Sequence, residues 1–140
     1  MPALFRIFPD HNLVYVRYFG IATIADYISV VEGYTKHPDY NVTRKILVDL
    51  SQLQDVERDY TAIMKLQARI AEFAVGAPSD ILSVVIANSQ IGREAAQMVF
   101  KSWENIDTPV VRRIAPDLET AASLLGMKKT VLTDLVSQIA

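Results

Sequence analysis

The chain has 140 residues, 51% of them hydrophobic and 21% charged, with a formal net charge of −2. This length and composition fit one globular domain that buries a core without a metal or a disulfide, and the charge balance argues against nucleic-acid binding. The sequence has no cysteine, which excludes thiolate chemistry, and no apolar run reaches the roughly 20 residues of a membrane span. Since no signal peptide is read at the N-terminus, we expect a cytoplasmic protein.

The first part of the chain predicts a hairpin, a helix and a strand. Apolar residues predict strands over residues 4–8 and 13–19, with turn residues between them and Gly20 ending the second strand. A capping signal precedes a helix expected from Ile24 to Lys36. A continuous apolar run then predicts a strand over residues 45–50 that is buried on both faces.

The middle of the chain predicts a helix followed by a second interior strand. Residues 51–58 are expected to form an acidic loop, after which Asp59 caps a helix that ends near Val75. Residues 81–87 are again continuously apolar and predict another interior strand. Ser89 is a suitable cap for the helix that follows it.

The last part of the chain predicts a short strand and two helices. Residues 110–114 carry Arg112 and Arg113 on opposite faces, as an edge strand does. Asp117 caps a helix that ends before a glycine. Residues 130–140 form a final amphipathic helix, which is too short to be stable alone and packs on its own domain or on a second subunit.

The alternation of strands and helices predicts an α/β fold in a single domain, residues 1–140. We expect a mostly parallel sheet of about five strands with an N-terminal β-hairpin, four helices and an extra C-terminal helix. The core of this domain spans about residues 4–126.

Three segments carry a family resemblance: the hairpin and helix of residues 12–36, the Ile-Leu-Val-Asp-Leu-Ser strand of residues 46–51, and the closing helix of residues 114–125. They are similar to the SpoIIAA-like fold of STAS domains, the anti-sigma-factor antagonists, and of related stand-alone domains grouped near the CRAL-TRIO lipid-binding proteins. The resemblance covers about residues 4–126. It implies a non-enzymatic regulatory or protein-interaction module.

The sequence departs from this family at the phosphorylation site. In the antagonists, a partner kinase phosphorylates a serine in an Asp-Ser-Ser-Gly turn, whereas the nearest positions here are Asp59, Tyr60, Thr61 and Ala62. Thr61 alone keeps a hydroxyl of the right kind. It lies in the first turn of a predicted helix, where a phosphate is favoured by the helix dipole, and an ordinary first-turn threonine is the alternative.

The resemblance and the apolar strand direct attention to the segment from Asp49 to Thr61. The candidate interaction loop consists of Asp49, Ser51, Asp55, Glu57, Asp59 and Thr61. Asp49 is either a functional carboxylate at the carboxyl end of a central strand or an acceptor of backbone N–H bonds. The acidic side chains lack the spacing of a calcium loop, so we expect no metal and no cofactor.

No catalytic constellation is visible in the sequence. His11 and His37 lack the partners of a zinc site, and no G-x-S-x-G elbow or Walker loop is present. An enzyme built on Asp49, Asp59 and one histidine is the remaining enzymatic alternative, and we expect no enzyme.

The aromatic residues suggest a second function, a carrier or sensor of a small apolar or amphiphilic, lipid-like ligand. Most aromatic side chains belong to the core, and Tyr27 and Trp103 are candidates for a pocket or an interface. The protein partner is not identified by the sequence. An edge strand and a spare amphipathic helix make a homodimer the expected assembly.

Overall fold

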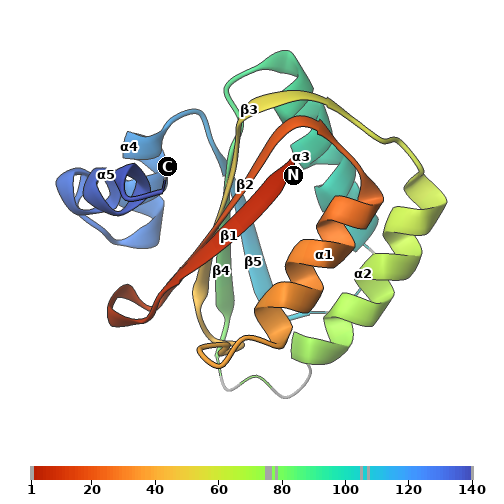
Figure 1. The fold of residues 1–140 in the computed structure, drawn as a ribbon. Coiled ribbons are helices and arrows are strands. Elements are labelled where there is room, and N and C mark those ends of the chain that lie inside the picture. Colours follow the sequence, from red (N-terminus) through yellow and green to blue (C-terminus); the bar gives the residue numbers. More distant parts are fainter. Residues whose placement is uncertain (1, 75–76, 78, 105, 107, 140) are drawn as a thin grey trace.

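The computed structural model describes residues 2–139 except 75, 76, 78, 105 and 107. These residues form a five-stranded sheet in the order β1-β2-β3-β4-β5, with helices on both of its faces (Figure 1). The β1–β2 pair is antiparallel and the other three pairs are parallel. The predicted α/β class, N-terminal hairpin and mostly parallel sheet are therefore confirmed.

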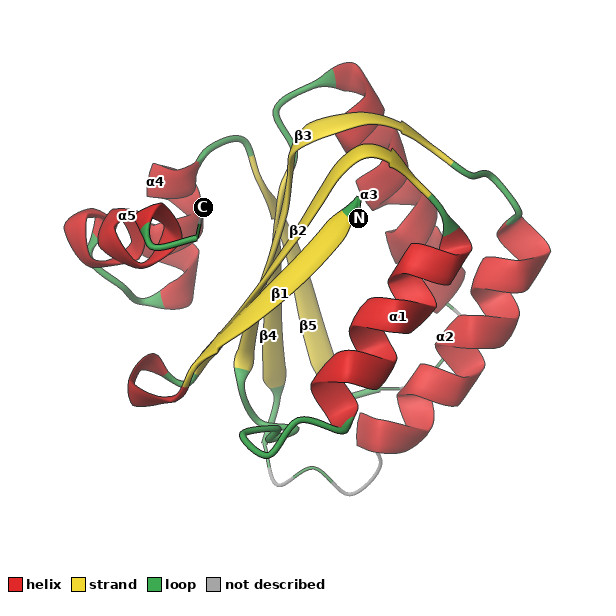
Figure 2. Cartoon of the chain, viewed as in Figure 1, coloured by secondary structure: helices red, strands yellow, loops and turns green. Residues whose placement is uncertain are grey.

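The elements follow the predicted order (Figure 2). The strands are β1 Ala3–Phe8, β2 Leu13–Ala22, β3 Lys45–Val56, β4 Ile81–Ile86 and β5 Val110–Ala115. The helices are α1 Ile24–Thr35, α2 Tyr60–Ala74, α3 Gln90–Trp103, α4 Leu118–Leu125 and α5 Lys129–Ser137, with a 3₁₀ turn at Pro9–His11. The end of α2 that we expected near Val75 lies outside the described residues.

The predicted helix caps are confirmed. Thr23 and Asp26 form a reciprocal capping box at the start of α1, and Ser89 accepts a hydrogen bond from the first turn of α3. Asp117 caps α4 in the same way, and Gly126 ends that helix at a φ of 70°. This left-handed conformation favours glycine because it carries no Cβ.

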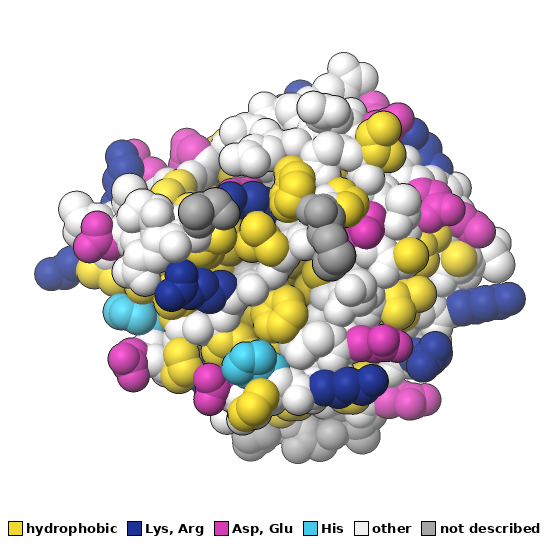
Figure 3. Space-filling view, viewed as in Figure 1, with side chains coloured by type: hydrophobic (Ala, Val, Ile, Leu, Met, Phe, Trp, Pro, Cys, Tyr) yellow, Lys and Arg dark blue, Asp and Glu magenta, His cyan; other side chains and the backbone are white. Residues whose placement is uncertain are grey.

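The helices are divided between the two faces of the sheet. The three helices that connect parallel strands, α1, α2 and α3, lie on one face, and α4 and α5 lie on the other (Figure 1). In the space-filling view, hydrophobic side chains occupy much of the middle of the visible face, and charged side chains lie mostly toward its margins (Figure 3). Because the strand order never reverses, the sheet has no topological switch point, the usual origin of a ligand crevice in open α/β sheets.

Strands β2 and β3 are longer than the sequence predicted. We expected β2 to end at Gly20 and residues 51–58 to be a loop, but β2 continues to Ala22 and pairs there with Val56 of β3. Two register shifts interrupt this pairing, and Gly20 adopts a φ of 61° between them. Bulges of this kind bend a strand, and the paired ends of β2 and β3 arch away from the sheet toward the start of α1 (Figure 1).

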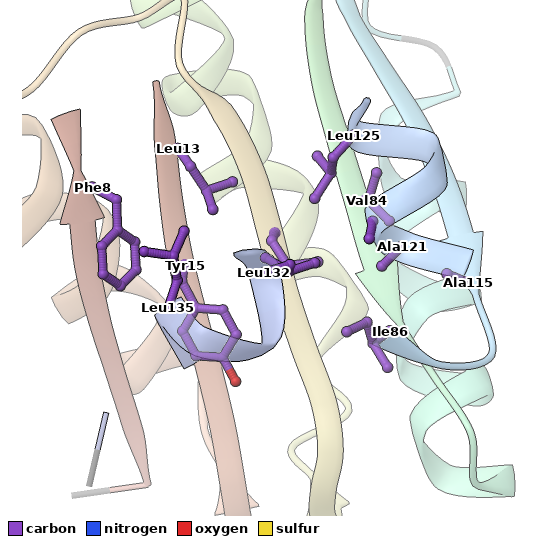
Figure 4. Packing of buried hydrophobic residues seen from close by; sticks show 12 residues of the cluster. Phe8, Leu13, Tyr15, Val84, Ile86, Ala115, Ala121, Leu125, Leu132 and Leu135 are labelled. Carbon is purple, nitrogen blue, oxygen red and sulfur yellow. The ribbon is translucent and has the colours of Figure 1, made fainter. Parts of the chain in front are cut away.

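Among the described residues, the largest cluster of buried side chains lies between the sheet and the α4–α5 pair (Figure 4). Leu13, Tyr15, Leu47 and Leu132 have no exposed surface there. The ammonium group of Lys45 also donates a 2.8 Å hydrogen bond to the carbonyl at the end of α4. We expected the terminal helix to pack on its own domain or on a second subunit. In the structure α5 packs on its own domain.

Candidate functional site

The opposite face of the sheet carries a partly open cavity. Helix α2 packs on α1 and α3 and makes little backbone contact with the strands. A cavity of about 280 Å³ lies between these three helices and the sheet, and its walls are almost entirely apolar. Because α2 stands away from the strands, the apolar side chains of this layer line a space instead of filling it.

Burial along the central strand differs between its two faces. Leu47, which faces α4 and α5, has 0% exposure, whereas its neighbours Ile46 and Val48 on the opposite face are only partly buried. Both neighbours line the cavity. The predicted burial on both faces is therefore less complete on the cavity side, where Leu50 is buried but Ile46 and Val48 are only partly so.

A chain of hydrogen bonds begins at Tyr27, which lines the cavity, and continues to Gln67 and Ser102, which do not. The Tyr27 hydroxyl donates to Gln67 Oε1 at 2.9 Å, and Gln67 Nε2 donates to the Ser102 hydroxyl at 3.1 Å. Gln67 has no exposed surface, and Ser102 donates in turn to the carbonyl of Val99. Burial raises the pKa of Tyr27 to about 12, and the hydrogen bond with Gln67 partly offsets this rise. Tyr27 therefore stays neutral near pH 7, with its proton committed to Gln67.

The far edge of the sheet contributes a cation to the cavity wall. The guanidinium of Arg112 lies 4.1 Å from the ring centre of Trp103, which is 7% exposed. Both side chains line the cavity. Burial lowers the pKa of Arg112 to about 10, so the side chain stays charged near neutral pH while it is partly removed from water.

The arch of β2 and β3 forms one end of the cavity wall. Ala22, Leu53 and Val56 of the arch line the space, and the first two are buried. The Glu57 carboxylate accepts a 2.9 Å hydrogen bond from the backbone N–H of Ile24, the first residue of α1. This contact fixes the arch to the start of α1, where a negative charge also complements the helix dipole.

The sequence predicts Asp49 at the carboxyl end of its strand. This prediction is wrong, because β3 continues to Val56. Asp49 sits within β3, 7% exposed, and its side chain accepts hydrogen bonds from the Tyr15 hydroxyl at 2.5 Å and from the Ser51 backbone N–H at 2.9 Å. The Ser51 N–H is at the first register shift, where the strand ladder is interrupted. Asp49 therefore satisfies a backbone donor at the bulge, which corresponds to the second of its two predicted roles.

The remaining members of the candidate interaction loop are exposed, and only Glu57 and Asp59 lie in the loop between β3 and α2. Ser51 and Asp55 lie in β3, and Thr61 lies in the first turn of α2. Asp55 pairs with Arg58 at 3.0 Å, and this neighbour together with a backbone hydrogen bond lowers the pKa of its carboxyl. Asp59 caps α2 through a 3.1 Å bond from the first turn.

The structure does not bring the enzymatic alternative together. The Asp49 carboxylate faces the α4–α5 side with Tyr15, whereas Asp59 caps a helix on the opposite face. His37 accepts a hydrogen bond from the Asp39 backbone, which gives it a local role in its turn. No group of three or more acidic or histidine side chains suited to a metal ion occurs among the residues that the structure describes.

Tyr27 and Trp103, the two pocket candidates, both line the cavity. The sequence reasoning did not identify the polar side chains that contact them, Gln67 and Arg112. Gln67 interrupts the apolar face of its helix, and that break in the pattern was the available signal. Arg112 was assigned only to the edge of the sheet, although its position on alternate residues with Val110 placed it on the inner face.

Comparison with protein-family models, with curated proteins and with solved structures finds no match to this chain. Among the described residues, no helix has the length and apolarity needed to cross a membrane.

Proposed function

We propose that this protein is a carrier or sensor that binds a small apolar or amphiphilic molecule in the cavity between the sheet and α1–α3. The observation that supports this function is a space of about 280 Å³ with an almost wholly apolar wall. Ligand pockets typically begin near 300 Å³, and a core cavity of about 150 Å³ already binds benzene. On that scale the cavity accommodates on the order of a dozen non-hydrogen atoms.

The chemistry of the wall favours binding over catalysis. The tyrosine hydroxyl in the Tyr27–Gln67 pair is neutral and already bonded, and it offers no general base. An apolar ligand gains dispersion contacts with side chains that otherwise face empty space. Bound ligand stabilises the folded state by mass action, since the unfolded chain has no cavity.

The first test is native mass spectrometry of the freshly purified protein, followed by thermal unfolding with added 1-decanol, a neutral probe of suitable size. We expect retained mass that is lost on denaturation, or a melting temperature that rises with decanol concentration. Val48→Phe fills the cavity from the central strand and should abolish the response. Val131→Phe makes the same change on α5, on the other face, and should keep it.

The proposed function fails if no mass is retained and neither decanol nor decanoate raises the melting temperature of the wild type. It also fails if both phenylalanine variants respond to decanol as the wild type does. The second result would place the bound molecule outside the cavity.

A second candidate function is a protein-interaction module of the SpoIIAA-like type. It is supported by the exposed stretch of β3 beyond Asp49, which pairs with β2 on one side and, within the described residues, has no β4 partner on the other. Exposed strand edges accept an added strand from a partner. Ser51 lies in this stretch and Thr61 follows it in the first turn of α2, and both are exposed.

Affinity capture with the wild type and with Gln52→Lys tests this second function, because a charged side chain on an exposed strand edge disfavours pairing with an added strand. A partner captured by the wild type and lost in the variant supports it. Capture that is unchanged by this substitution and by Thr61→Glu argues against it. A homodimer, proposed from the edge strands β1 and β5, is tested in the same samples by native mass spectrometry.

A further inference from the structure

The floor of the cavity is apolar except at one corner. The strand register places Val14, Ile46, Ser83 and Arg112 in one row across β2, β3, β4 and β5, and all four line the cavity. The first two are aliphatic and the last two are polar. Side chains in such a row are neighbours, since adjacent strands lie about 4.8 Å apart. The floor therefore changes from aliphatic to polar along a single direction.

The cation in this corner lacks a counter-charge from the described part of the chain. Among the described residues, no carboxylate lies within ion-pair distance of Arg112, and its side chain makes no hydrogen bond to them. Its only specific contact there is the face of Trp103. A charge that is partly removed from water without a partner is unfavourable, and an anion that enters the cavity would compensate it.

The neighbouring polar groups restrict which ligand group suits this corner. The hydroxyl proton of Tyr27 is donated to Gln67, so Tyr27 offers only an acceptor to a ligand. Arg112 has five N–H donors in a planar fork, and the Ser83 hydroxyl beside it adds another. The corner therefore favours a planar, singly charged acceptor, which a carboxylate supplies in a bidentate geometry. A doubly charged phosphate would leave one charge uncompensated beside an apolar wall.

We propose that the ligand is a monocarboxylic acid with an apolar body, whose carboxylate pairs with Arg112 and Ser83 while its hydrocarbon part lies over Val14 and Ile46. This inference rests on the proposed binding function and adds the class of ligand. The cavity volume matches a saturated acid of about ten carbons, on the order of a dozen non-hydrogen atoms.

Decanoate and 1-decanol are the paired probes, because they share a chain length and differ in the carboxylate. Binding is followed at pH 8 by isothermal titration and by tryptophan fluorescence. Trp103 is the only tryptophan in the chain, and it stacks on the cation that the carboxylate would approach. We expect decanoate to bind roughly ten- to a hundredfold more tightly than decanol, because the free energy of a hydrogen bond to a charged group corresponds to an affinity ratio in this range.

Two matched variants identify the cation. Arg112→Met keeps an unbranched side chain of similar length and removes the charge, and it should reduce the preference for decanoate to less than threefold. Arg113→Met makes the same change at the adjacent, exposed position and should leave the preference unchanged. Arg112→Lys keeps the charge without the planar fork and should give an intermediate preference.

Loss of folding does not explain the expected result for Arg112→Met, because the variant removes a partly desolvated charge and should melt at or above the wild-type temperature in the absence of ligand. Equal affinities of decanoate and decanol for the wild type overturn the carboxylate inference and leave the binding function intact. A decanoate preference that survives in Arg112→Met also overturns it. Failure of both probes to bind, together with no retained mass in the native spectrum, refutes the binding function itself.

Discussion

Replacement of Tyr15 by phenylalanine removes one hydroxyl from the core between the sheet and the α4–α5 pair. That hydroxyl has no exposed surface and donates a 2.5 Å hydrogen bond to the carboxylate of Asp49, which is 7% exposed. Without it, one carboxylate oxygen loses its only described donor, and the other keeps the Ser51 N–H. Arg17 Nε, which donates to the same hydroxyl at 3.1 Å, loses its acceptor too.

The expected cost is set by the charge of the acceptor. Hydrogen bonds to charged groups contribute about 1.5–3 kcal/mol, against about 0.5–1.5 kcal/mol for neutral pairs. We therefore expect Tyr15→Phe to lower the free energy of unfolding by about 2 kcal/mol. In a chain of this size that loss lowers the melting temperature by about 6 °C.

The matched control is Tyr34→Phe. The Tyr34 hydroxyl donates a 2.8 Å hydrogen bond to the backbone carbonyl of Asn41 at an exposed site, so the same chemical change removes a neutral, solvated bond. We expect a cost below about 1 kcal/mol. Urea unfolding is measured for Tyr15→Phe, Tyr34→Phe, Asp49→Asn and the Tyr15→Phe/Asp49→Asn double variant. The double variant gives the coupling energy between Tyr15 and Asp49. The reasoning is refuted if Tyr15→Phe costs no more than Tyr34→Phe, or if the two Tyr15–Asp49 changes are additive.

The other predictions concern pH and backbone conformation. Burial raises the pKa of Tyr27 to about 12 from its usual 10, so the stability it contributes is complete below pH 10 and falls by about 1.4 kcal/mol per pH unit between pH 10 and 12. In an alkaline titration, the last part of the tyrosinate absorbance should therefore rise together with the loss of the circular dichroism signal. Complete ionisation of the tyrosines near pH 10 with an unchanged circular dichroism signal would contradict this. Gly126→Ala forces a φ of 70° on a residue with a Cβ and should cost about 1–2 kcal/mol in urea unfolding, with Gly126→Asn costing less.

The sequence predicted the order and type of the elements because those depend on local signals. The caps at Thr23, Ser89 and Asp117 each act within four residues of themselves, and the apolar runs of β3 and β4 identify strands without reference to their neighbours. The prediction of a loop at the outer end of β3 was wrong because the structure of that end depends on a distant segment. Residues 51–56 are mostly polar and exposed, and they form a strand because the end of β2 pairs with them.

The cavity was not predictable from periodicity. An apolar stripe shows which side of a helix faces inward, but it does not show how far the helix stands from the sheet. Ile63 and Ile70 lie at the spacing of one helical face, and both line the cavity. The Tyr15–Asp49 bond, which joins residues 34 positions apart, is likewise invisible before the strands are aligned.

The sequential strand order has a consequence for synthesis of the chain. Each parallel strand adds to the outer edge of the sheet already made, and none is inserted between two earlier strands. The sheet can therefore grow in step with translation, since domains begin to fold from the N-terminal end as they emerge. Helices α4 and α5 come last, and until they emerge the apolar face around Leu13 and Leu47 has no cover. The sheet therefore most needs protection from aggregation in the interval between completion of β5 and emergence of α4 and α5.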